Sequence, residues 1–161
     1  MNKSKYFKQL SEIRTLYRER IFAEIEKAYP LRISPYFYKW ETVFTPIEKR
    51  AWHDIRILGL PLYPQIPVGK YFIDFGDPIK KIGVEVDGAA WHKDERRDNE
   101  RQQAIENMGW EIWRIPGSAC YRQDGDIATS EDILTELRDL HYPEGVIGVC
   151  TFPEAVRGLN V

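Results

Sequence analysis

Cysteine and histidine are scarce in this sequence of 161 residues, which contains two cysteines and three histidines. Cys120 and Cys150 are too few and too far apart for a zinc knuckle, because such a site needs closely spaced ligand pairs. We interpret both as reduced thiols, with a disulfide between them as the alternative. The scarcity excludes a cysteine-rich metal site as the basis of the fold.

Long apolar runs are also missing, and so is a net charge of one sign. No stretch approaches the roughly 18 apolar residues that a membrane span needs. The charged, amphipathic N-terminus, MNKSKYFKQLSEIRTLYRER, is unlike a signal peptide, so we expect a cytoplasmic protein without a membrane partner. The formal net charge is -2, so any nucleic-acid surface must come from local clusters of lysine and arginine.

The composition that remains is that of a globular domain. Hydrophobic residues make up 43% and charged residues 30% of the chain, and the length is sufficient for one buried core. We predict a single domain over residues 1–161. Its expected parts are an N-terminal helical extension (1–44), a core (45–122), and a C-terminal helix with a tail (123–161).

The sequence pattern predicts four helices, three of them from periodic apolar residues. The first runs from Tyr6 to Ala28, with apolar residues at steps of three and four, and Pro30 closes it. The second begins with a capping signal, in which Thr45 and Glu48 are three residues apart, and ends at Gly59. Two more helices are expected, a polar one at 94–108 and one at 130–140 whose inward residues are Ile133, Leu134, Leu137 and Leu140. Residues 31–44 receive no assignment.

Extended patterns predict four strands between these helices, at 62–68, 71–75, 82–86 and 110–115. Pro64 and Pro67 mark the first as an edge strand, and Gly76, Asp77 and Pro78 form the turn between the second and third. The segment GVIGVCTF at 145–152 is a candidate for a further strand. This order predicts an α/β fold with one mixed central sheet flanked by helices.

Acidic residues interrupt two of the predicted strands. Asp74 lies in the run YFIDF, and Glu85 lies in IGVEV. If the strands pair around a symmetric turn near residues 78–81, Asp74 lies opposite Glu85, and strand alternation places Asp87 on the side of Glu85. Opposed like charges destabilise a sheet, and carboxylates among apolar neighbours carry a desolvation cost.

Three converging carboxylates need a compensating charge. A hard divalent cation with oxygen ligands, Mg²⁺ or Mn²⁺, supplies it. In the alternative interpretation, the acids lie at a solvated strand end and pair with Lys80, Lys81 or an arginine.

Three segments together resemble the very-short-patch-repair-like (Vsr-like) endonuclease domains of the PD-(D/E)XK superfamily: YFIDF, KKIGVEVDGAAWH and DERRDNERQQAIENMGWEIWRIPG. The resemblance covers about residues 45–122, the expected nuclease core. It implies a restriction-endonuclease-like core, with the N-terminal helix as an addition, and a DNA endonuclease that depends on Mg²⁺ or Mn²⁺.

The resemblance also implies roles for individual residues. Asp74 and Glu85 would hold the metal with help from the Val86 carbonyl, and the metal would activate a water for phosphodiester hydrolysis. Glu48 matches a glutamate that completes the metal shell through water. Its position in a capping box explains it equally well, and the two roles are compatible.

The sequence departs from the superfamily pattern in one catalytic position. Asp87 stands where the lysine that names the superfamily would fall. His92 is a candidate general base, because imidazole titrates in the required range; whether Asp87 or His92 replaces the lysine is left open. The mismatch-repair enzymes of this family also bind a structural zinc, which the two cysteines cannot hold.

Basic residues around the expected site form a candidate DNA-binding surface. Arg97 and Arg101 lie four residues apart on one helix face. With Lys70, Lys93 and Arg96 they would contact phosphates. In the alternative, these cations pair with the interleaved acids Asp94, Asp98 and Glu100.

Two other functions fit the same residues. One is a catalytically inactive module with a nuclease fold that binds nucleic acid. The other is a structure-specific junction nuclease that works as a homodimer, for which the N-terminal helix would supply a dimer face.

Overall fold

The computed structural model describes residues 2–29, 34–35, 38–88, 95–121 and 128–145. A four-stranded sheet lies at its centre in the order β1-β2-β3-β4. The strands are β1 (Tyr63–Val68), β2 (Tyr71–Asp77), β3 (Ile82–Asp87) and β4 (Glu111–Pro116). The first three are antiparallel, whereas β4 runs parallel to β3. The mixed central sheet is therefore confirmed.

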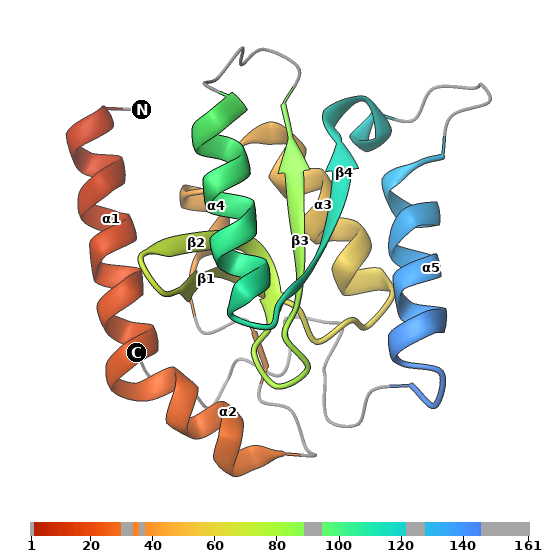
Figure 1. Cartoon of the computed structure of the whole chain (residues 1–161), viewed down its shortest axis with the longest axis horizontal. Helices are drawn as coiled ribbons and strands as arrows, with labels where there is room; N and C mark the ends of the chain where they lie inside the picture. The colour runs from red at the N-terminus through yellow and green to blue at the C-terminus, as the bar shows by residue number, and fades with distance from the viewer. Residues whose placement is uncertain (1, 30–33, 36–37, 89–94, 122–127, 146–161) are drawn as a thin grey trace.

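Helices cover both faces of this sheet (Figure 1). One face carries α4 (Glu95–Asn107), and the other carries α3 (Pro46–Ile57), with α5 (Ser130–His141) packed beside α3. Helices α3 and α5 bury most of the apolar side that their periodicity predicted, since Ala51, Ile55, Leu134 and Leu137 are all at most 1% exposed. The expectation for Leu140 was wrong, because this residue lies near the end of α5 and is 64% exposed. The α/β class is confirmed.

The predicted N-terminal helix is continuous but not uniform. It consists of α1 (Lys3–Leu16), a π-helical segment η1 (Tyr17–Ile21) and α2 (Phe22–Ala28), and the axis bends between α1 and α2 (Figure 1). An inserted π turn is a common cause of such a bend. The inward residues Ile13 and Ile25, on either side of this segment, are buried, and so is Tyr17 within it.

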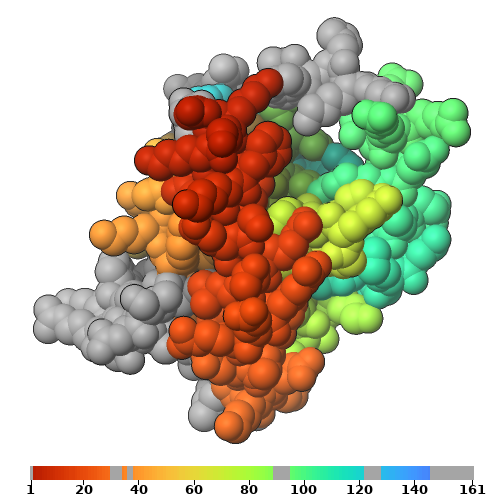
Figure 2. Space-filling view, turned by 90° about the vertical axis from the view of Figure 1, so that its left-hand side faces the viewer, coloured from red at the N-terminus to blue at the C-terminus, as the bar shows by residue number. Residues whose placement is uncertain are grey.

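The N-terminal helix covers the hairpin of β1 and β2. Figure 2 shows α1 along this hairpin, with α4 beyond it. The Tyr17 hydroxyl donates a hydrogen bond to the Pro64 carbonyl of β1. As predicted, β1 is an edge strand, and every residue in it is buried.

The turn between β2 and β3 begins later than predicted. Gly76 and Asp77 belong to β2 and pair with Gly83 and Ile82. Asp77 is fully buried, and its carboxylate accepts hydrogen bonds from the Ile79 amide at 2.9 Å and the Tyr142 hydroxyl at 2.7 Å. These hydrogen bonds satisfy the buried carboxylate, so Asp77 can lie inside the strand instead of in an exposed turn.

The unassigned stretch contains a short 3-10 helix, η2 (Trp40–Thr42), in which Trp40 is a core residue. The possible strand in GVIGVCTF lies outside the described residues, apart from Gly145. None of the helices in the described ranges is sufficiently long and apolar to cross a membrane.

Candidate active site

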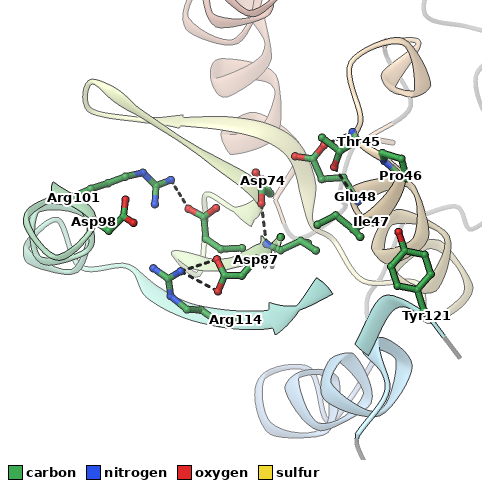
Figure 3. A pocket seen from close by; sticks show the side chains of 13 residues that line it. Thr45, Pro46, Ile47, Glu48, Asp74, Asp87, Asp98, Arg101, Arg114 and Tyr121 are labelled. Atoms are coloured by element: carbon green, nitrogen blue, oxygen red, sulfur yellow. Dashed lines mark hydrogen bonds and ion pairs between the residues drawn. The ribbon is translucent and has the colours of Figure 1, made fainter. Parts of the chain in front are cut away.

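A pocket of about 740 Å³ opens at the end of β3, where the first turn of α3, the middle of β2 and one side of α4 meet (Figure 3). Five of the predicted site acids and cations line it, together with the predicted carbonyl donor. Its lining includes Glu48, Asp74, Glu85, Val86, Asp87, Asp98, Arg101, Arg114 and Tyr121.

The pairing of β2 with β3 brings the two central acids together. Phe75 pairs with Val84, and the same register places Asp74 opposite Glu85. The Val86 amide donates a hydrogen bond to Asp74 Oδ2 at 2.8 Å. Glu85 is 7% exposed, and both acids line the pocket.

The backbone of β1 is unusual where it passes this point. Gln65 is level with Asp74 in the pairing of β1 with β2 and has a left-handed conformation with φ of 50°. Side chains other than glycine adopt this region at an energetic cost, and such positions concentrate at functional sites.

The electrostatics of the acids favour added positive charge. Burial raises the pKa of the Asp74 carboxyl well above its usual range, and the charges of Glu85 and Glu48 raise it further. The hydrogen bond from Val86 acts in the opposite direction but is the smaller effect. Asp74 therefore binds a proton more strongly than a solvated carboxylate does, and a cation placed beside it would relieve the same repulsion.

Glu48 belongs to the capping box of α3 and also lines the pocket. Its side chain accepts a hydrogen bond from the Thr45 amide, which completes the capping box of α3. The same residue is 9% exposed and lines the pocket. Helix capping therefore places a carboxylate beside Asp74.

Two arginines face the acids from the side opposite α3 (Figure 3). Arg101 of α4 donates hydrogen bonds to Glu85 Oε1 and to the Phe72 carbonyl. Arg114 of β4 donates to both oxygens of Asp87, at 2.9 and 3.1 Å. Asp87 is thus held by a guanidinium group on both of its carboxylate oxygens.

The other predicted DNA contacts lie away from the pocket or outside the described residues. Lys70 lies at the turn between β1 and β2, with its ammonium 5.2 Å from the centre of the Tyr71 ring. Arg96 is exposed and pairs with Glu100 at 3.0 Å. Arg97 is an exposed residue of α4. His92 and Lys93 lie outside the residues that the structure describes.

Sequence patterns gave no role to several residues of the site. Arg114 pairs with Glu85 in the parallel register of β3 and β4, a long-range relationship that strand periodicity does not reveal. Tyr121 is an exposed aromatic residue on the pocket wall. The charges of Glu48 and Asp74 help to raise the pKa of Tyr6 on α1, although burial is the larger cause. The N-terminal helix therefore reaches the neighbourhood of the acids.

The donor set suits a hard divalent ion. In the described part of the chain, no three side chains of histidine, cysteine, aspartate or glutamate form a ready-made metal site. Asp74 and Glu85 supply two carboxylates, however, and Val86 can add its carbonyl oxygen. Mg²⁺ is commonly held in this way, by one or two carboxylates with water and substrate oxygens as the remaining ligands.

Comparisons with known proteins give a family and one solved structure. The structure is similar to the catalytic domain of the homing endonuclease I-Bth0305I, with a TM-score of 0.41 and 18% identity, over 47% of this chain and 79% of that one. A comparison with curated proteins gives no match. The model of the restriction-endonuclease-like family REase_MTES_1575 matches residues 47–137, which is more than half of the sequence and contains Glu48, Asp74, Glu85, Asp87 and Arg101. The chain therefore belongs to the REase_MTES_1575 family.

Proposed function

We propose that this protein is a metal-dependent DNA endonuclease of the PD-(D/E)XK type. The observation that carries the proposal is the convergence of Asp74, Glu85 and Glu48 from three elements into one pocket. Such a cluster is costly to bury unless a cation binds it. In a protein of a restriction-endonuclease-like family, a cation bound by these acids would serve phosphodiester hydrolysis.

Asp74, Glu85 and the Val86 carbonyl would hold Mg²⁺ or Mn²⁺. A bound ion supplies an activated water and stabilises the negative charge that develops on the phosphate. Glu48 would contact the water molecules around the ion. Its side chain lines the pocket, where the hydrogen bond from the Thr45 amide holds the carboxylate in place. Because Arg114 holds both oxygens of Asp87, Asp87 is better suited to positioning than to proton transfer, and His92 is our candidate general base.

The substrate that we propose is DNA. A chain of net charge -2 needs local positive charge to bind a polyanion. Helix α4 carries Arg101 in the pocket and Arg96 and Arg97 on its exposed surface, and Lys70 and Lys93 complete the proposed phosphate-binding set.

Cleavage assays test the proposal directly. Supercoiled plasmid and labelled single-stranded, duplex and branched DNA are incubated with the protein in Mg²⁺, Mn²⁺ or EDTA. Asp74→Asn and Glu85→Gln should each lower the cleavage rate by about 100-fold or more. Glu136→Gln, which changes an exposed acid of α5 in the same way, is the matched control and should cleave as wild type does.

The outcomes separate the alternatives. Cleavage that needs a divalent ion and is lost in both site variants supports the endonuclease. Metal-independent DNA binding without cleavage of any substrate would contradict it and leave the inactive binding module. Preference for branched DNA, together with a dimeric mass by light scattering, would favour the junction nuclease.

A further inference from the structure

Arg101 is a fixed cation inside the acidic pocket. From α4 its guanidinium reaches both Glu85 Oε1 and the Phe72 carbonyl, and it lies 5.9 Å from the centre of the Tyr71 ring. The side chains of Arg101 and Glu85 are 28% and 10% exposed, respectively. This partly buried pair is shielded from solvent, so its electrostatic coupling exceeds that of a surface ion pair.

The neighbouring arginines are engaged elsewhere. Arg114 donates to Asp87 and also to Gln102 Oε1 at 3.0 Å, and Arg96 pairs with Glu100 near the solvent. Among the ion pairs described for this site, the one that reaches Glu85 comes from Arg101. The position of Arg101 therefore bears directly on how Glu85 binds any other cation.

One guanidinium does not balance the acids around it. Asp74, Glu85 and Glu48 are three carboxyl groups that line the same pocket as this single guanidinium. A divalent ion would relieve the repulsion among these carboxyl groups. However, the ion and Arg101 would then share Glu85, and two cations at one carboxylate repel each other.

We propose that Arg101 competes with the divalent ion for Glu85 and, when the ion binds, turns its free N–H groups to a phosphate of the DNA. This inference rests on the proposed function and adds a second cation to it. The contact with the Phe72 carbonyl tethers the guanidinium within the pocket while the contact with Glu85 is exchanged. A guanidinium has five N–H donors in a planar fork that matches two phosphate oxygens, so one backbone contact leaves donors for the substrate.

Competition and phosphate binding predict effects of opposite sign on two measurements. In Arg101→Met, Mn²⁺ binding measured by titration calorimetry without DNA should become about tenfold tighter or more, as expected for removal of one charge close to an ionised group. Cleavage at saturating Mn²⁺ should fall by about 100-fold, because a donor to the developing charge is lost. Damage to the fold would instead weaken Mn²⁺ binding and DNA cleavage together.

Two further variants sharpen the test. Arg101→Lys keeps the charge but loses the planar fork, so its Mn²⁺ affinity should remain close to that of wild type while cleavage falls. Arg138→Met removes an arginine that pairs with Asp139 on α5 and should change neither measurement. Circular dichroism melting curves establish that each variant is folded.

Each other outcome overturns the inference. Weaker or unchanged Mn²⁺ binding in Arg101→Met would exclude competition for Glu85, and unchanged cleavage would exclude contact with the phosphate. Both results leave the endonuclease intact if wild type binds Mn²⁺ and cleaves. Wild type that neither binds Mn²⁺ nor cleaves would instead overturn the proposed function, and this inference with it.

Discussion

The Val86 amide of β3 donates a hydrogen bond to the Asp74 carboxylate of β2 at 2.8 Å. This bond links the two strands that carry the central acids at the point where their regular pairing ends, beyond Phe75 and Val84. The Asp74 carboxylate therefore has two roles: it accepts a hydrogen bond that links β2 to β3, and it adds a negative charge to the pocket. A substitution that keeps the acceptor oxygen but removes the charge separates these two roles.

Asp74→Asn should make stability less dependent on pH. The raised pKa of Asp74 in the folded protein means that the wild-type stability from this group is complete near pH 4 and below, and declines as pH rises through the folded-state pKa. Asparagine does not ionise and can still accept from Val86, so it avoids the decline. Thermal unfolding in EDTA from about pH 4 to about pH 9 should show an advantage for the variant that grows with pH. A constant difference across this range would contradict the assignment.

Divalent ions should stabilise the wild-type protein. A ligand that binds the folded state alone adds about 2.7 kcal/mol at 100 times its dissociation constant. Melting temperatures in Mg²⁺ or Mn²⁺ and in EDTA measure this effect. The shift should be reduced in Asp74→Asn and Glu85→Gln and retained in the α5 control Glu136→Gln. Equal shifts in all four proteins would place ion binding elsewhere.

Local sequence patterns predicted most of the fold because the elements are locally consistent. The capping box at Thr45, the apolar stripes of α3 and α5, and the prolines of β1 all act within a few residues. The start of the turn after β2 was misplaced because its buried acid is satisfied by Tyr142, which lies 65 residues further along the chain. The sequence pattern also did not predict the π turn at Tyr17–Ile21, because the buried apolar residues recur at similar steps on both sides of it.

The central acids of the site were predictable, but their partners were not. Asp74 and Glu85 interrupt apolar strands, and a symmetric hairpin already places them opposite each other. Arg101 was assigned to the DNA surface from its helix position, whereas the structure shows it bound to Glu85. Strand periodicity does not reveal which side chain of α4 reaches Glu85 of β3. The catalytic and metal-binding roles of all these residues remain predictions.

Gly117→Ala should disturb both stability and the site. A Cβ at Gly117 would lie 2.8 Å from the Asp87 carbonyl oxygen, and backbone atoms cannot move aside as a flexible side chain does. Overpacking of this kind costs about 1–3 kcal/mol, and the end of β3 must shift to relieve it. Urea unfolding and plasmid cleavage should both show a loss, whereas the neighbouring Ser118→Ala should show neither. Wild-type stability in Gly117→Ala would contradict the close approach.

Cys120 should react slowly with thiol reagents in the folded protein. The residue is 1% exposed, and burial, with a smaller contribution from Asp54, raises its pKa to about 11. At pH 8 about one thiol in a thousand is then ionised, and the thiolate is the reactive form. In a Cys150→Ser background, maleimide labelling of Cys120 should be at least about 100-fold slower in buffer than in denaturant. Similar rates in the two conditions would show that the thiol is accessible.

Thr45→Ala and Glu48→Gln should separate helix capping from the chemistry of the site. Thr45→Ala removes the side-chain acceptor of the Glu48 amide, so unfolding free energy should fall by about 1 kcal/mol while cleavage stays near wild type. In Glu48→Gln the amide oxygen still accepts from the Thr45 backbone, so stability should change by less than about 0.5 kcal/mol. The variant loses a charge beside Asp74, however, and cleavage should fall about 10-fold to 100-fold if Glu48 supports the metal shell. Full cleavage by Glu48→Gln would leave this glutamate with capping as its only role, and the acidic site would then consist of Asp74 and Glu85.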